Sequence, residues 1–141
     1  MGALNTKAAL LWMVLICFCN FNSITMVDAR DLVVGGEKWH FGFNYTDWAL
    51  KSAPFYVNDV LVFKYARPNG SIFHDVWRIH QVQKFKMCNL QGAQRLAHEN
   101  SGVDEGFRYK LKEKKPYYIA CGIRDGFHCN VGLMKFSLQP I

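Results

Sequence analysis

Residues 60–81 read VLVFKYARPNGSIFHDVWRIHQ, and this stretch decides the class of fold. An apolar, β-branched and aromatic run over residues 60–65 ends at the turn-forming sequence Pro68-Asn69-Gly70, and residues 72–81 form the next extended candidate. Runs of this length that are bounded by proline, asparagine and glycine are typical of strands joined by turns. The stretch therefore predicts two consecutive β-strands.

The same pattern continues on both sides of this stretch. Further short runs between turn residues lie at 32–34, 106–112, 117–121 and 133–138. Two segments favour short helices: residues 48–50, which Thr46 or Asp47 could cap, and residues 90–97. Many short strands in about a hundred residues favour an antiparallel sandwich with Greek-key connections over a βαβ fold. We therefore predict an all-β Greek-key sandwich with one or two short helices.

Length and composition allow one folded domain. The chain has 141 residues, of which 50% are hydrophobic and 15% aromatic. This is too apolar for a disordered tail and too short for a multidomain enzyme. The formal charge of +6, from 17 Lys and Arg against 11 Asp and Glu, favours a negatively charged partner or surface.

The first 29 residues have the features of a secretory signal peptide. Lys7 precedes an apolar run over residues 8–18, and Val27-Asp28-Ala29 forms a small-residue exit. An apolar run this short cannot span a bilayer, and the combination is typical of a signal cleaved after Ala29. We predict that residues 1–29 are removed and that residues 30–141 form the exported domain. Export disfavours a nucleic-acid partner.

Other features fit a secreted glycoprotein. Asn44 and Asn69 begin sequons for N-glycosylation, which are expected on surface loops. The C-terminus lacks the polar spacer and hydrophobic tail of a lipid-anchor signal. We expect a soluble, monomeric protein in the extracellular space or cell wall, with no transmembrane segment.

The predicted mature chain keeps an odd number of cysteines: Cys88, Cys121 and Cys129. In an oxidising compartment two thiols pair, and the third sulfur needs another role. Residues 121–134 read CGIRDGFHCNVGLM, which places a thiol, an imidazole and a thioether close together in the sequence. Two histidines and one cysteine, with a weak axial methionine, form the trigonal site that holds redox-active copper. An inert buried thiol at Cys121 is the alternative.

Several motifs are similar to those of one family. They are VGG at 34–36 with Trp39, YTDWA at 45–49, FYVNDVLVFKY at 55–65, HDV at 74–76, YYIACG at 117–122 and HC at 128–129. Over nearly all of residues 31–139 the chain resembles the phytocyanins, the plant branch of the cupredoxins. The resemblance implies a cupredoxin-like sandwich that binds one type 1 copper ion.

The resemblance also implies roles for individual residues. His74, Cys121 and His128 would bind the copper, and Cys88 would form a disulfide with Cys129. The protein would then carry single electrons between redox partners that the sequence does not identify, and it would not be an enzyme.

The sequence departs from the family pattern in two places. Six residues separate Cys121 from His128, where the family usually has four. Leu133 occupies the position of the family's axial residue, and Met134 follows it. Because neighbouring strand residues face opposite sides of a sheet, only one of them can point at the metal without a bulge. We favour Met134 as the axial ligand, with Leu133 as the competing position.

Two other functions remain open on the sequence alone. The chain could be a copper-free module that binds carbohydrate or protein, as early nodulin-like relatives are thought to be, although those relatives typically lack the ligands kept here. The basic run at 110–115 could dock on acidic cell-wall polysaccharide or on membrane headgroups, or it could be a solvated hairpin. A thiol enzyme built on Cys121 and His128 has less support, because no third orienting group is evident.

Overall fold

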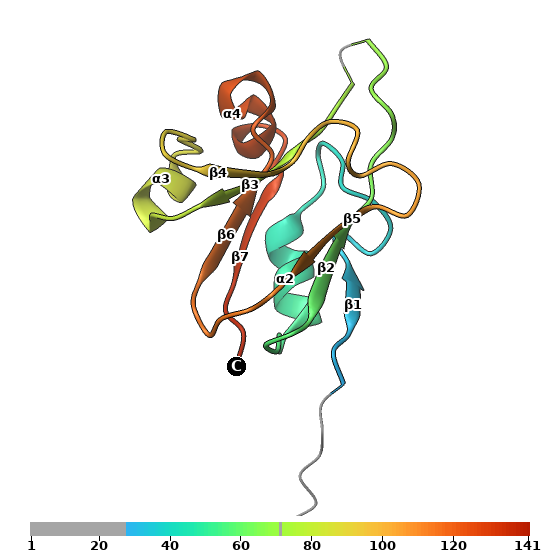
Figure 1. Ribbon diagram of the computed structural model, residues 1–141. Coiled ribbons are helices and arrows are strands. Elements are labelled where there is room, and N and C mark those ends of the chain that lie inside the picture. The colour runs from blue at the N-terminus through green and yellow to red at the C-terminus, as the bar shows by residue number, and fades with distance from the viewer. Residues whose placement is uncertain (1–27, 71) are drawn as a thin grey trace, which may run out of the picture.

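The computed structural model describes residues 28–70 and 72–141, and it consists of two sheets of short strands with a few short helices (Figure 1). Residues 1–27 lie outside this part of the chain, so the signal peptide stays a prediction. Among the described residues, no helix has the length and apolar character needed to cross a membrane.

The strands form one three-stranded and one four-stranded sheet. The first sheet has the order β1 (Asp31–Val33), β2 (Val60–Phe63), β5 (Phe107–Lys110), and the second has the order β4 (Gln94–Ala97), β3 (Val76–Ile79), β6 (Tyr117–Ala120), β7 (Lys135–Leu138). All pairs are antiparallel except β1 with β2. Because the chain passes between the sheets at β2–β3, β4–β5 and β5–β6, this topology confirms the predicted β-sandwich.

Aromatic side chains fill the space between the sheets. Trp39 packs on Tyr45 with ring centroids 4.4 Å apart and meets Phe63 edge-on at 5.4 Å. On β7, Phe136 and Leu138 are buried while Ser137 is exposed, as expected for a strand with one face on the core. Burying each large apolar side chain stabilises the fold by about 1.5–3 kcal/mol. This core holds the strand ends, and so the candidate site, in fixed positions.

The helices differ from the sequence prediction in two ways. Helix α2 (Tyr45–Ser52) is capped by Asn44, whose side-chain oxygen accepts from the backbone N–H of Asp47, so the prediction of Thr46 or Asp47 as cap was wrong. The predicted helix over residues 90–97 was also wrong. Its second half is strand β4, because backbone hydrogen bonds to β3 outweigh the local helix preference.

Two short helices were not predicted: α3 (Val82–Lys86) and α4 (Ile123–Asn130).

Asn44 and Asn69 are both exposed, and glycosylation at either position stays a prediction. Ser71 of the second sequon lies outside the described residues.

Candidate metal centre

Two neighbouring strands place His74 and Cys121 at the same end of the second sheet. His74 lies just before β3, and Cys121 directly follows β6. The two strands are antiparallel, with Trp77 opposite Ala120, so the start of one lies beside the end of the other. Helix α4, which carries His128, packs at this end of the sheet (Figure 1).

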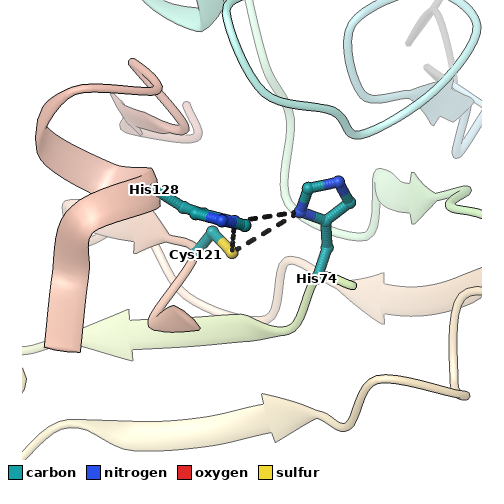
Figure 2. Close-up of side chains that lie close together, drawn as sticks. All are labelled: His74, Cys121 and His128. Atoms are coloured by element: carbon teal, nitrogen blue, oxygen red, sulfur yellow. Dashed lines mark hydrogen bonds between the residues drawn. The ribbon is translucent and has the colours of Figure 1, made fainter. Parts of the chain in front are cut away.

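The side chains of His74, Cys121 and His128 converge on one point (Figure 2). The Nδ1 atoms of the histidines lie 3.2 Å apart, and Cys121 Sγ lies 3.6 Å from Nδ1 of His128 and 4.0 Å from Nδ1 of His74. A circle through these three atoms has a radius of about 2.1 Å, close to the roughly 2.0–2.3 Å of metal bonds to imidazole nitrogen and thiolate sulfur. One ion could therefore touch all three atoms in their plane.

The long connection between Cys121 and His128 folds into a compact turn. Arg124, Asp125 and Gly126 have φ angles of 53°, 51° and 83°, in the left-handed region. A Cβ atom on Gly126 would lie 2.5 Å from the carbonyl oxygen of Cys88, so this position needs glycine. The two extra residues are absorbed in this turn, and His128 still returns to the sulfur.

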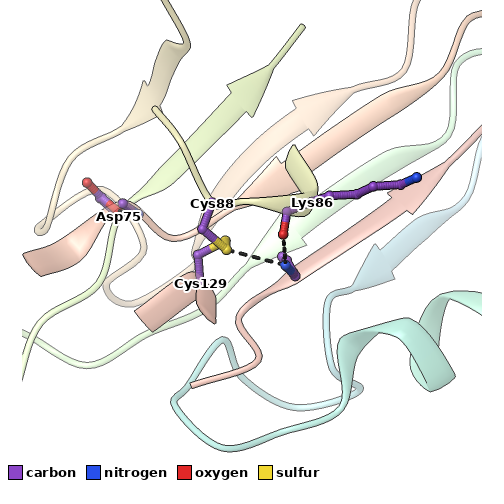
Figure 3. Close-up of a disulfide and its surroundings, with 6 residues drawn as sticks. Asp75, Lys86, Cys88 and Cys129 are labelled. Atoms are coloured by element: carbon purple, nitrogen blue, oxygen red, sulfur yellow. Dashed lines mark hydrogen bonds between the residues drawn. A yellow bond between two sulfur atoms is a disulfide. The ribbon is translucent and has the colours of Figure 1, made fainter. Parts of the chain in front are cut away.

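A disulfide lies directly behind His128. Cys88 and Cys129 are bonded, with Cα atoms 5.8 Å apart, as the family resemblance implied (Figure 3). Lys135 packs against the bond, and its Nζ donates to the carbonyl oxygen of Lys86 at 3.0 Å. Cys121 is a free, buried thiol. The pairing therefore anchors the residue next to one imidazole and leaves the third sulfur available for a metal.

Met134 and Leu133 face opposite environments. Met134 is fully buried in the same apolar cluster as Cys121, whereas Leu133 is 48% exposed and has a φ of 57°. The backbone of Met134 also joins two of the candidate ligands, because its N–H donates to the carbonyl of His128 and its carbonyl accepts from the N–H of Cys121. The structure therefore buries only one of the two side chains, that of Met134, and the backbone at Leu133 is left-handed.

Asp75 belongs to this cluster, although sequence analysis did not identify it. Its Oδ1 accepts from the backbone N–H of Gly122 at 2.6 Å and from the thiol of Cys121 at 3.5 Å. Its Oδ2 accepts from Nε1 of Trp77 at 2.5 Å. The signal available in the sequence was an acidic residue beside His74, at the start of a strand that the core buries.

Burial keeps the three candidate ligands uncharged near neutral pH. It raises the pKa of the Cys121 thiol to about 12. The pKa of His74 is lowered to about 4, first by burial and then by the charge of neighbouring His128. The pKa of His128 is also lowered, by burial and then by Arg124. Neutral imidazoles are ready to bind a metal, and a cation must displace only the proton of the thiol.

The imidazoles border a hollow in the surface. It has a volume of about 440 Å³, and besides His74 and His128 its lining includes Phe41, Phe127 and Arg124. The ring of Phe41 meets that of His128 edge-on, with centroids 5.3 Å apart. Cys121 does not line the hollow and has no exposed surface. The surface side of the site is therefore made of imidazole and phenyl rings, with the sulfur behind them.

Lowering the pH from 6.5 to 4 is expected to destabilise the metal-free protein. Histidine in an unfolded chain takes up a proton near pH 6.5, whereas folded His74 stays neutral down to about pH 4. The unfolded state therefore binds more protons in this range, and the free energy of unfolding decreases as the pH is lowered. Urea unfolding at pH 7, 5.5 and 4 measures the effect.

The variant His74→Gln is the control for this prediction, and its unfolding free energy should depend less on pH. The lowered pKa values of Asp31 and Asp59 affect a different range, because those carboxylates lose their contribution only below about pH 4. An equal pH dependence in the variant and the parent protein would contradict the assignment to His74.

Comparison with known proteins agrees with this site. A family model described as a plastocyanin-like domain matches residues 39–133. The structure is similar to that of cucumber stellacyanin with Cu²⁺, at 25% identity and a TM-score of 0.64, over 81% of this chain and 96% of that chain. It is also similar to cucumber basic protein, a blue copper protein, at 31% identity and a TM-score of 0.58, over 79% of this chain and 99% of that chain.

A third solved structure shows the fold alone. Spinach plantacyanin is 22% identical, with a TM-score of 0.53 over 79% of this chain and 99% of that chain. Curated protein sequences gave no significant match. The family model covers more than half of the chain, and the two cucumber proteins, both described with copper, share its fold. The chain therefore belongs to the plastocyanin-like family of blue copper proteins, in its phytocyanin branch.

Proposed function

We propose that the protein carries single electrons by means of one copper ion held by His74, Cys121 and His128. The observation that carries this proposal is the position of their three donor atoms on a circle with a radius of about 2.1 Å. This radius matches the bond lengths of a metal bound to two imidazoles and a thiolate. This donor set, in a trigonal arrangement, is the one used by blue copper sites.

Each residue has a distinct part in this function. When bound, copper would supply the redox couple, since thiolate sulfur suits Cu(I) and imidazole nitrogen also suits Cu(II). Cys121 would give the strongly bound sulfur, and its burial shields it from solvent. His128 and His74 would hold the ion from the surface side and offer the route for electrons through the hollow. The disulfide beside His128 fixes the ring, which limits movement between the two oxidation states.

Electron transfer is favoured over enzymatic chemistry at the same residues. Cys121 has no exposed surface, and burial raises its pKa to about 12. A nucleophilic cysteine needs a substantial thiolate fraction and access to its substrate. The sulfur therefore suits a metal better than a covalent intermediate.

Addition of Cu(II) to the reduced, metal-free protein tests the proposal. One equivalent of copper should bind and produce an intense visible absorption band from the Cys121 thiolate. Further copper should not increase the band. A protein that stays colourless, or that binds copper without this band, would contradict the proposed site.

We extend the proposal to Met134 as the weak axial donor. It is buried in the same cluster as Cys121, whereas Leu133 is 48% exposed. Met134→Leu should keep the visible band but raise the reduction potential, because loss of the weak thioether donor favours Cu(I). Leu133→Ala is the matched control and should leave the potential unchanged. Spectroelectrochemistry of both variants measures the difference, and a larger shift for Leu133→Ala would reverse the assignment.

We also propose that the protein acts outside the cell, in the extracellular space or cell wall. The buried disulfide supports this location, because such bonds persist in oxidising compartments. The two exposed sequon asparagines and the sequence of residues 1–29 are in agreement.

A second candidate function, the binding of acidic polysaccharide, is supported by a separate hollow. It has a volume of about 610 Å³, and its lining includes Arg78, His80, Lys115 and Tyr118 as well as Glu113, which lies 3.5 Å from the ammonium of Lys115. It lies where β3 ends and β6 begins, at the opposite end of these strands from the metal centre. The guanidinium of Arg78 and the ammonium of Lys115, near the ring of Tyr118, suit the carboxylate and ring face of a uronic acid, which would compete with Glu113 for Lys115. Binding there would leave the metal centre free.

Neutralising this hollow should weaken binding to polygalacturonate. The double variant Arg78→Gln/Lys115→Gln is expected to bind about tenfold more weakly, or about 1.4 kcal/mol. Binding of the parent protein should fall as salt is added, because exposed charges are screened. The double variant Lys38→Gln/Lys51→Gln, which removes two exposed positive charges outside this hollow, is the control and should retain most of the binding. Equal losses in both variants would show that only the overall charge matters.

A further inference from the structure

We propose that Asp75 places a fixed negative charge beside the copper-binding sulfur and so shifts the site towards Cu(II); this inference rests on the proposed copper function. Asp75 would lower the reduction potential without being a ligand. The argument depends on its contacts, its burial and the absence of a cationic partner among the described residues.

All the side-chain contacts of Asp75 come from hydrogen-bond donors. Gly122 donates its backbone N–H at 2.6 Å, Trp77 donates its indole N–H at 2.5 Å, and the Cys121 thiol donates at 3.5 Å. Each oxygen of the carboxyl group accepts one N–H group, Oδ1 from Gly122 and Oδ2 from Trp77. Hydrogen bonds of this kind favour the charged form of a carboxylate, so the surroundings suit the anion.

The negative charge is buried and has no cation beside it. Asp75 is 2% exposed. The described part of the chain contains four ion pairs, and none of them includes Asp75. A buried charge without a partner is costly, since the interior screens it poorly. A metal cation held by Cys121 would supply the missing positive charge.

The balance of charge decides which oxidation state is favoured. When copper binds, the thiol of Cys121 loses its proton, so the sulfur and Asp75 together contribute two negative charges. Bound Cu(II) would neutralise both charges. Bound Cu(I), which carries one positive charge less, would leave one net negative charge in a buried site. Asp75 therefore stabilises Cu(II) more than Cu(I), and the reduction potential falls.

Asp75 also positions the site, through its side chain and its backbone. Its bond to Gly122 joins the segment that carries His74 to the turn that follows Cys121. The backbone carbonyl of Asp75 accepts from Nε1 of Trp39 at 3.0 Å, which ties this segment to the core. A test must therefore separate the effect of charge from the effect of position.

The variant Asp75→Asn removes the charge and keeps the size of the side chain. We expect the ratio of Cu(II) to Cu(I) binding constants, measured with competing chelators, to fall about tenfold, which equals a rise in potential of about 59 mV for one electron. Redox titration at an electrode gives the potential independently. The visible band should remain, because the three ligands are unchanged.

Two further variants separate charge from position. Trp77→Phe removes a hydrogen bond to Asp75 but keeps the carboxylate, so its potential should stay the same or fall. Asp75→Glu keeps the charge that Asp75→Asn removes, so its potential should be closer to that of the parent protein than the potential of Asp75→Asn. The proposal is overturned if Asp75→Asn and Trp77→Phe raise the potential equally, or if Asp75→Asn weakens both oxidation states by the same factor. A colourless parent protein would instead reject the copper function itself.

Discussion

Replacement of Cys121 with serine is expected to abolish the visible copper band completely. The band requires a copper-bound thiolate, and Cys121 is the only free cysteine among the described residues. Cu(II) affinity should also fall by roughly a hundredfold or more, since the loss of an outer-sphere partner alone costs about 10–100-fold. Visible absorption and competition with a Cu(II) chelator measure the two effects.

The fold of this variant should survive, which makes the test specific to the metal. Serine is slightly smaller than cysteine, and its hydroxyl can donate to Asp75 in place of the thiol. We therefore expect the metal-free variant to unfold at nearly the same denaturant concentration as the parent. A visible band that persists in Cys121→Ser would contradict the assignment of the sulfur.

Removal of the disulfide is expected to lower both stability and copper affinity. Cys88 and Cys129 are 41 residues apart in sequence, and closing a loop of this length contributes about 4 kcal/mol in the chain-entropy model. The double variant Cys88→Ala/Cys129→Ala should therefore lose about 2–5 kcal/mol of unfolding free energy. Its copper affinity should fall as well, because Cys129 anchors the residue next to His128.

Chemical unfolding of the metal-free forms measures the stability term, and chelator competition measures the copper term. Lys135→Met is a suitable control, since it removes the ammonium that contacts Lys86 and Cys88 but leaves the disulfide intact. It should change stability much less than the double variant. A double variant that is as stable as the parent and binds copper equally well would contradict the structural role of the bond.

The sandwich could be predicted from sequence because its signals are local. Residues 60–65 form an apolar run that ends at turn-forming residues, as is typical of a strand, and β2 (Val60–Phe63) lies within this run. The helix predicted over residues 90–97 failed for the opposite reason. Strand β4 gains its stability from pairing with β3, which is distant information that a local pattern does not contain.

The candidate metal centre was only partly accessible from the sequence. His74, Cys121 and His128 were found through their residue types and the family resemblance, and the structure brings them together. The turn at Arg124–Gly126 was not foreseen, because left-handed conformations at non-glycine residues depend on the surrounding structure. Asp75 was missed because its role depends on which backbone N–H groups and which sulfur the fold places against its oxygens.

X-ray absorption at the copper edge of the copper-loaded protein tests the central claim most directly. The spectrum reports the atoms bound to copper, irrespective of any change in stability. With His74, Cys121 and His128 as ligands, the first shell should contain two nitrogen atoms and one short sulfur contact. A first shell of nitrogen and oxygen alone, without sulfur, would contradict a blue copper site in this protein.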